Sequence, residues 1–310
     1  MKKALLWMMV VVLGIVLMAC STDGPGSNGA NDEDNTGGDG EYTIGFSIST
    51  LNNPFFVTLQ EGAEEKAEEL GVELIMVDAQ DDNAKQVSDV EDLIQQGVDL
   101  ILINPTDSAS VISAVELANA DDIPVITVDR GADGGEIKAH IASDNVAGGE
   151  MAGEFLVDLV GEGAEVAELE GIPGSSAARE RGEGFNNIAG DSLDVVTSQS
   201  ANFDRAEGLT VMENILQSNP DIKGVFAHND EMALGALEAI EASGNDDIVI
   251  VGFDATDDAV AAVEDGRLAG TVAQQPVLIG EEALDAALAL LNGDTVEEFI
   301  PVRLELVVEE

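Results

Sequence analysis

The feature that most constrains this chain is a regular alternation of short apolar runs with amphipathic helical stretches, which begins near Tyr42. Strands separated by helices of about 10–15 residues indicate βαβ units and a parallel sheet. In a first series, the pattern predicts strands at 43–49, 73–77, 100–103 and 125–128, and helices at 56–70, 84–96 and 108–119.

A second series of the same kind follows. It predicts strands at 166–169, 195–198, 224–227, 248–252 and 270–272, and helices at 145–160, 177–186, 205–218, 231–242 and 255–264. A helix at 277–291 and a strand at 304–308 complete the count. Two doubly wound sheets are favoured over one sheet of nine or more strands. The chain of 310 residues is therefore expected to form an α/β fold with two parallel-sheet lobes.

Polar and aromatic residues gather where the predicted strands end, which is where open α/β sheets bind ligands. The candidates are Asn53, Phe55, Phe56, Asn104, Asp129, Arg130, Arg179, Arg181, Phe203, Asn229, Asp230, Asp254 and Gln274. No glycine-rich phosphate motif follows any of these strands. Carboxylates, amides, guanidiniums and flat aromatic faces are instead what a sugar requires, because hydroxyls both donate and accept and the ring stacks on aromatics.

Several of these residues also have a purely structural interpretation. Asn53 and Asn104 precede prolines and could be turn residues, and Asp230 is more readily explained as the N-cap of its helix. Asp129 and Arg130 could form a local ion pair, and Arg179 could lie on the surface. Considered together at the strand ends of two lobes, a cleft site is the better interpretation.

Phe55 and Phe56 follow Pro54 directly where the first strand ends. Neighbouring residues on a helix point about 100° apart, so the two rings cannot share one core face. Their divergent directions suit the wall of a cleft.

The first 41 residues are expected to be a targeting segment and a tether. Lys2 and Lys3 precede an apolar stretch, 4–18, which is shorter than the ~20 residues of a membrane span. It ends in the letters LMAC, which resemble the lipobox of bacterial lipoproteins, so residues 1–20 are interpreted as a lipoprotein signal peptide ending at a lipidated Cys20. Residues 21–41 are rich in Gly, Ser, Asn and Asp and indicate a flexible acidic tether. The alternatives are an uncleaved anchor or an ordinary secretory signal.

The formal net charge of −50, from 62 acidic and 12 basic residues, restricts the partners. It argues against nucleic acid or an anionic membrane surface, because phosphate binding is driven by Lys and Arg. Such a charge repels itself in dilute buffer, so adaptation to high salt is favoured over a merely acidic protein. Cys20 is the only cysteine, which excludes disulfides and cysteine metal sites, and no cofactor or metal is predicted.

Nine sequence blocks carry a resemblance to a known family. They are STLNNPFF, ILINPTDS, IPVITVDR, HIASDNVAGG, GSSAARERGEGF, FDR, NDEMALGAL, VGFD and AQ, in this order. The chain from Tyr42 onward resembles the bacterial ribose-binding protein family, which are the substrate-binding components of ribose ABC transporters.

The resemblance implies a type I periplasmic binding protein-like fold whose lobes are joined by a three-segment hinge. The crossings would lie near 143–144, 274–275 and 303–304, giving a first lobe of 42–143 plus 275–303 and a second of 144–274 plus 304–310. It also implies a monomer outside the cytoplasm, with an ABC transporter permease as partner and a chemoreceptor as a second candidate. Carried over by position, the sugar-binding residues are Asn53, Phe55, Phe56, Asn104, Asp129, Arg130, Arg181, Phe203, Asn229, Asp254 and Gln274. His228, Ala255 and Gln275 depart from the family pattern, which leaves the fine specificity open.

Three other functions are weighed against capture of D-ribose. An enzyme is disfavoured, because the sequence shows no Ser/His/Asp set and no metal cluster. The only histidines are His140 and His228. His140 lies in a strand-like run and is expected to be structural, whereas His228 could line the cleft. A sugar-responsive repressor would need an N-terminal helix-turn-helix and basic charge. The signal segment and the charge of −50 argue against it. A binding protein for another small sugar, such as allose, galactose or a furanosyl signal molecule, remains open.

Overall fold

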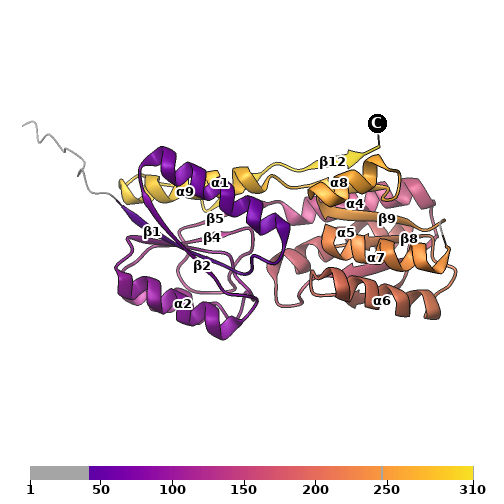
Figure 1. The fold of residues 1–310 in the computed structure, drawn as a ribbon, viewed down its shortest axis with the longest axis horizontal. Helices are drawn as coiled ribbons and strands as arrows, with labels where there is room; N and C mark the ends of the chain where they lie inside the picture. The colour runs from indigo at the N-terminus through magenta and orange to yellow at the C-terminus, as the bar shows by residue number, and fades with distance from the viewer. Residues whose placement is uncertain (1–41, 246, 310) are drawn as a thin grey trace, which may run out of the picture. The chain divides into compact units, whose positions relative to one another are not determined.

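The computed structural model describes residues 42–245 and 247–309, which form two parallel-sheet lobes, as predicted (Figure 1). The predicted signal peptide, Cys20 and the tether lie outside the described residues. Among the helices of the described part, none is long and apolar enough to cross a bilayer.

The first lobe contains a six-stranded sheet in the order β11-β5-β4-β3-β1-β2, and every neighbouring pair in it is parallel. Its strands are β1 (Thr43–Ile48), β2 (Glu73–Asp78), β3 (Leu100–Ile103), β4 (Val125–Val128), β5 (Ala139–Ser143) and β11 (Phe299–Val302). Its helices are α1 (Pro54–Leu70), α2 (Asn83–Gln96), α3 (Ile112–Ala120) and α9 (Pro276–Leu291).

The second lobe contains another six-stranded sheet, in the order β12-β10-β9-β8-β6-β7, which is parallel except for the antiparallel pair of β10 and β12. Its strands are β6 (Glu165–Glu170), β7 (Asp194–Ser200), β8 (Gly224–Ala227), β9 (Val249–Asp254), β10 (Gly270–Ala273) and β12 (Glu305–Val308). Its helices are α4 (Asn145–Val160), α5 (Ser176–Ser192), α6 (Arg205–Ser218), α7 (Asp230–Ser243) and α8 (Asp257–Glu264).

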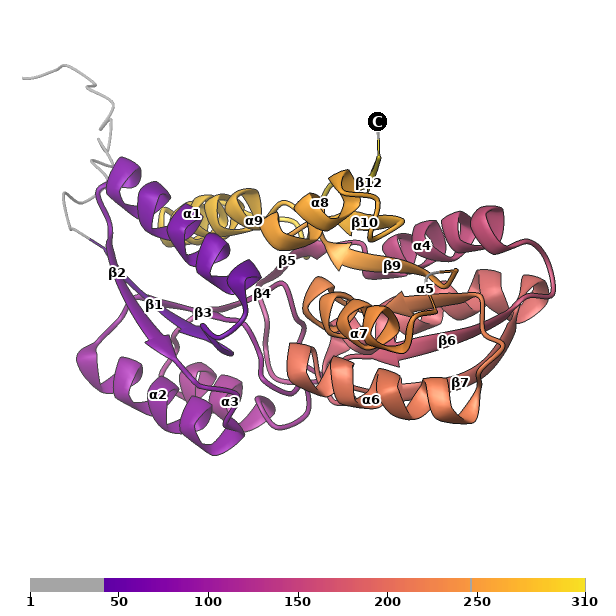
Figure 2. The same cartoon turned by 45° about the vertical axis from the view of Figure 1, so that its right-hand side comes forward.

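Helices cover both faces of each sheet, which explains the almost continuous apolar character of the central strands. Along β3, Leu100 and Leu102 face a core cluster shared with α1 and α9, while Ile101 and Ile103 face a second cluster under α2 and α3. Figure 2 shows α1 and α9 side by side on one face of the first sheet. In the second lobe, α4 and α5 cover one face, and α6, α7 and α8 cover the other.

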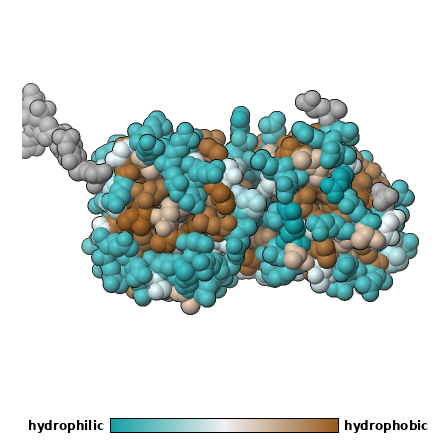
Figure 3. Space-filling view, in the orientation of Figure 1, coloured by the Kyte–Doolittle hydropathy of each residue, from teal (hydrophilic) through white to brown (hydrophobic). Residues whose placement is uncertain are grey.

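Local sequence signals set the ends of several helices. Asn53 caps α1 and Pro54 occupies its first turn, and Gly71 ends it in the left-handed conformation with φ 70°. Figure 3 shows hydrophilic residues over much of the molecular face, as expected from the charge, with hydrophobic residues between them on both lobes.

Two strands, β5 and β11, were absent from the strands predicted by alternation. β11 contains Pro301, which cannot donate to a ladder, and it lies at a sheet edge where this is tolerated. β5 has the sequence AHIAS, in which Ile141 is the only large apolar residue, so it gives little apolar signal, although the run around His140 had a strand-like character.

The chain passes from one sheet to the other three times, after β5, after β10 and after β11. We propose that these passages are the hinge, which gives the lobe boundaries expected from the sequence.

Helices α4 and α5 of the second lobe touch through glycine. A Cβ atom on Gly149 would lie 2.2 Å from the carbonyl oxygen of Arg181, and one on Gly184 would lie 2.0 Å from that of Val146. No Cβ can occupy these positions without moving a helix, so glycine sets the depth at which α5 packs. This matters for function because α5 carries Arg181.

We therefore predict that Gly184→Ala destabilises the protein by about 1–3 kcal/mol, because the new methyl group overpacks against backbone. Chemical denaturation measures the effect. Gly190→Ala is the matched control in the same helix. Its Cβ would have open space, so alanine should stabilise by roughly 0.5–1 kcal/mol through helix propensity. Equal effects of the two substitutions would contradict the close helix contact.

Candidate functional site

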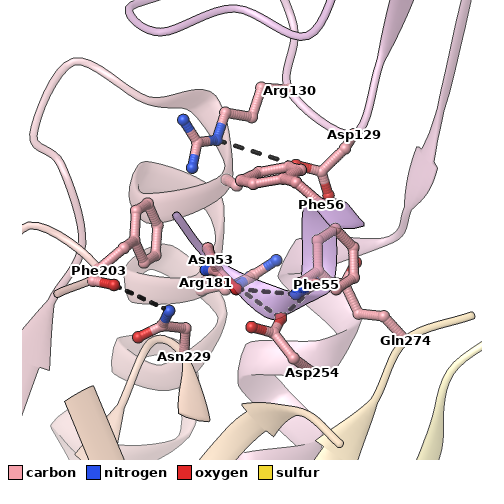
Figure 4. Close-up of a pocket in the computed structure, with 11 residues that line it drawn as sticks. Asn53, Phe55, Phe56, Asp129, Arg130, Arg181, Phe203, Asn229, Asp254 and Gln274 are labelled. Atoms are coloured by element: carbon pink, nitrogen blue, oxygen red, sulfur yellow. Dashed lines mark hydrogen bonds and ion pairs between the residues drawn. The ribbon is translucent and has the colours of Figure 1, made fainter. Parts of the chain in front are cut away.

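A pocket lies between the two lobes at the carboxyl ends of their strands, where doubly wound sheets bind ligands. Figure 4 shows the side chains that line it. Ten of the eleven predicted residues are among them, with Ala177 as a further member: Asn53, Phe55, Phe56, Asp129, Arg130, Arg181, Phe203, Asn229, Asp254 and Gln274. The cavity left between these side chains measures about 10 Å³, room for about one water molecule, so a larger ligand would have to displace the lining side chains.

The first turn of α1 supplies the aromatic wall of the first lobe. Asn53 Oδ1 accepts a hydrogen bond from Phe55 N at 2.9 Å, so Asn53 caps the helix and lines the pocket at once. Phe55 and Phe56 are both buried, with ring centroids 5.2 Å apart and ring planes at 83°. The adjacent rings thus present an edge and a face to the pocket (Figure 4).

Asn104 is the one predicted residue that does not line the pocket. Its Oδ1 accepts from Ser49 N at 3.1 Å, and its Nδ2 donates to Val128 O at 2.9 Å and to Asp129 Oδ2 at 3.3 Å. It therefore joins the ends of three strands and supports Asp129 from behind. A direct sugar contact from Asn104 stays a prediction.

Asp129 and Arg130 form a buried ion pair where β4 ends, with Arg130 Nε 3.8 Å from Asp129 Oδ2. Asp129 has φ 62°, a left-handed conformation that non-glycine residues seldom adopt. Burial raises the pKa of Asp129 and lowers that of Arg130, and each charge opposes the other's shift. The Arg130 guanidinium lies 5.0 Å from the ring centre of Phe56 and 5.1 Å from that of Phe203, so it is close to an aromatic ring of each lobe.

Arg181 of α5 is fixed by hydrogen bonds, an ion pair and an aromatic contact within the second lobe. Its Nε donates to Asn145 Oδ1 at 2.9 Å, and its Nη1 donates to the carbonyl oxygen of His228 at 2.6 Å. The guanidinium lies 3.9 Å from the ring centre of Phe253, and Nη1 is 3.6 Å from Asp254 Oδ1. These contacts fix the fork of Arg181 toward the pocket.

Asp254 is the last residue of β9. Its carboxylate contacts Arg181 of the second lobe and Gln274 of the proposed hinge. Gln274 Nε2 donates to Asp254 Oδ1 at 2.8 Å. Burial raises the pKa of Asp254 well above its usual range, and the nearby Arg181 charge opposes this. Within the described residues, Gln274 Oε1 and Asp129 Oδ1 are buried oxygens without a hydrogen-bond partner. Both residues line the pocket, so it offers acceptors to a ligand that brings its own donors.

Phe203 and Asn229 complete the pocket wall in the second lobe. Phe203 has φ 62°, and Gly171 leaves the room for its ring, since a Cβ there would lie 2.1 Å from the ring. Asn229 Nδ2 donates to Phe203 O at 3.2 Å, while its Oδ1 accepts from Met232 N at 3.0 Å. Asn229 is therefore the N-cap of α7, and the expectation that Asp230 caps this helix was wrong.

The sequence did not decide whether His228 and Arg179 contribute to the cleft, and the structure places both side chains. The His228 side chain does not line the pocket, because it lies in the second-lobe core, with Nε2 3.0 Å from Glu168 Oε1 and Nδ1 accepting from Gly171 N. Arg179 is partly exposed and pairs with Asp133 Oδ1 of the first lobe at 2.7 Å.

The lobes also touch directly beside the pocket. Ser108 N of the first lobe donates to Gly174 O at 2.9 Å, and Ser176 N of the second donates to Ser108 Oγ at 3.1 Å. Gly131 N donates to Ser176 Oγ at 2.8 Å. These contacts join the two lobes beside the pocket, whose wall comes from both.

Sequence reasoning missed three residues of the site. Asn145 follows directly on β5 in the block HIASDNVAGG, so the strand-end rule would have found it had β5 been recognised. Phe253 precedes Asp254 and reads as core from sequence, yet its ring lies under Arg181. Ala177 gives no chemical signal and contributes by being small. Within the described residues, no cluster of three or more potential ligands could hold a metal ion.

Comparison with known proteins identifies the family. Residues 44–295 match the model of the periplasmic binding protein domain. The ribose import binding protein of Bacillus subtilis (strain 168) is 56% identical over 99% of both chains. A solute-binding protein of an ABC transporter from Bacillus halodurans C-125, solved with bound myo-inositol, has a TM-score of 0.83 and 37% identity, covering 88% of this chain and 96% of its own. One from Actinobacillus succinogenes 130z, with bound D-allose, has a TM-score of 0.81 and 32% identity, covering 86% and 98%.

The match covers most of the chain, and the two lobes with their intervening pocket agree with it. This chain therefore belongs to the periplasmic binding protein family, which consists of solute-binding proteins and not of enzymes.

Proposed function

We propose that this protein captures D-ribose between its lobes and delivers it to the permease of an ABC transporter. The observation that carries the proposal is the pocket between the lobes, to which both lobes contribute charged, amide and aromatic side chains. The B. subtilis relative named for ribose import supports the choice of sugar.

The chemistry of the pocket supports a monosaccharide in particular. The unpartnered oxygens of Asp129 and Gln274 can accept from sugar hydroxyls, and Arg181 and Arg130 can donate to them. Phe56 and Phe203 can pack on the C–H faces of the ring. Contacts from both lobes would make the closed state bind sugar better than the open state, which is what closure requires.

A second candidate is another small polyol or sugar. Solved relatives hold D-allose and myo-inositol, so allose, galactose or a furanosyl signal molecule would suit a pocket of this kind. In either case the partner is an ABC permease, with a chemoreceptor as a further candidate, and the protein acts as a monomer outside the cytoplasm.

A thermal-shift panel of pentoses and hexoses in high salt tests the proposal. D-ribose is expected to raise the melting temperature most, because a ligand that binds only the folded state stabilises it. Arg181→Ala should weaken ribose binding in calorimetry by roughly 30-fold to several thousand-fold, since an unpaired buried partner costs ~2–5 kcal/mol.

Arg267→Ala is the matched control. This arginine pairs with Glu241 on the surface of the second lobe and should leave affinity unchanged. No shift with ribose but a large one with another sugar would overturn the choice of ligand. Wild-type affinity in Arg181→Ala would refute the site.

We further propose that a lipid on Cys20 anchors the protein to a membrane, with residues 21–41 as tether. This part rests on sequence alone. Cys20→Ser is expected to move the protein from the membrane fraction to the soluble extracytoplasmic fraction and to abolish incorporation of labelled fatty acid. Unchanged membrane retention of the variant, without lipid label in either form, would exclude the anchor.

We also propose that the acidic surface is an adaptation to high salt. With a net charge of −50, raising KCl to molar concentration shortens the Debye length to ~3 Å and should raise the free energy of unfolding. Denaturation in dilute buffer, in molar KCl and in a sucrose solution of matched osmolality separates screening from solute exclusion. Equal stability in dilute buffer and in KCl would show that the charge has another cause.

A further inference from the structure

One buried carboxylate beneath the pocket has no part in the site as described so far. Asp230, in the first turn of α7, is fully buried. Its Oδ1 accepts from Thr271 Oγ1 at 2.7 Å, and its Oδ2 accepts from Thr256 N at 2.8 Å and from Thr256 Oγ1 at 3.3 Å. Thr271 Oγ1 in turn accepts from Ala255 N at 3.2 Å. Asp230 thus binds the corner 254–256 directly and through Thr271.

This corner has an unusual backbone. Asp254 has φ 122° and Ala255 has φ 57°, so two successive non-glycine residues adopt positive φ. Such conformations are unfavourable and persist only where surrounding contacts enforce them. The turn directs the Asp254 carboxylate toward Arg181 and Gln274 in the pocket. Asp230 accepts directly from the amide of Thr256, and it also binds the hydroxyl of Thr271, which accepts from the amide of Ala255.

Burying the carboxylate of Asp230 costs free energy of folding, which a purely structural role does not explain. None of the ion pairs among the described residues includes it, and the nearby charges of Glu231 and Asp254 have the same sign. Burial raises the pKa of Asp230 to about 7. The strand beside it is also adapted, because a Cβ on Gly252 would lie 2.3 Å from Asp230 Oδ1. A group with this cost, packed this closely, needs a compensating role.

We propose that Asp230 is a positioning residue of the sugar site, which holds the strained corner 254–256 so that Asp254 faces the ligand. The inference rests on the proposed function in that Asp254 is taken to contact the sugar. It accounts for three residues that do not line the pocket, Asp230, Gly252 and Thr271, by one local arrangement.

A double-mutant cycle with D-ribose and calorimetry tests it. Asp230→Ala is expected to weaken affinity about 10-fold or more, because the hydroxyl of Thr271 and the amide and hydroxyl of Thr256 lose their acceptor and the corner relaxes. In an Asp254→Asn background the same substitution should change affinity less than about 2-fold, since Asp230 acts through Asp254. Thr271→Val, which keeps the shape but removes the bridging hydroxyl, should act in the same direction as Asp230→Ala.

Met212→Ala is the matched control for lost stability. It truncates a buried second-lobe residue away from the corner and should lower the melting temperature while sparing affinity. An equal loss of affinity from Asp230→Ala with and without the Asp254 carboxylate, or no loss in either background, would overturn the proposal.

Crystal structures of the Thr271→Val and Asp230→Asn variants, both without sugar, test the proposal independently of ribose binding. They are needed if Asp230→Ala fails to fold or if the wild type does not bind ribose. The proposal requires Asp254 to leave its positive φ in Thr271→Val. Asn can still accept from Thr256 N, so Asp230→Asn should retain more of the corner. An unchanged corner in Thr271→Val would refute the inference, whereas failure of wild-type ribose binding alone would refute the proposed function.

Discussion

The pocket depends on four buried charges that neutralise one another within each lobe. Asp129 pairs with Arg130 in the first lobe, and Asp254 with Arg181 in the second, at 3.8 and 3.6 Å. Both distances are longer than a direct hydrogen bond, so each pair offsets part of the cost of burial while leaving donors and acceptors free. Burial still raises the pKa of both carboxyls, which indicates that the protein alone does not fully compensate them.

The same charged residues account for the position of helix α5 and for the strained backbone around the pocket. Arg181 needs helix α5 close to α4, which the glycine contacts allow. Asp129, Phe203 and Asp254 all have positive φ, and each is braced by a neighbour: by Asn104, by the amide of Asn229 and, as we propose, by Asp230. The backbone strain of the site is thus concentrated at residues that face the pocket, and its supports lie one layer behind.

Much of this arrangement was predictable from sequence, because it depends on local periodicity and on one topological rule. Apolar alternation indicated two doubly wound lobes, and the strand-end rule, with the resemblance to sugar-binding proteins, indicated ten of the residues that line the pocket. What escaped prediction depends on tertiary contact. β11 carries a proline and forms only against β5, and the hydrogen bonds by which Asn104 joins the ends of three strands arise only in the folded protein. The cap of α7 shifted by one residue because Asn229 and Asp230 are both good caps. Only the folded structure distinguishes them: Asn229 is extended and accepts from Met232 N, whereas Asp230 is already the first residue of the helix.

The central claim is that a monosaccharide completes the charged pocket by occupying the acceptors that the protein leaves open. A crystal structure of the D-ribose complex tests it most directly. We expect the ring between Phe56 and Phe203, with hydroxyls donating to Asp129 Oδ1 and Gln274 Oε1 and accepting from Arg181. A ribose bound elsewhere, or one that leaves both oxygens without a partner, would contradict the account.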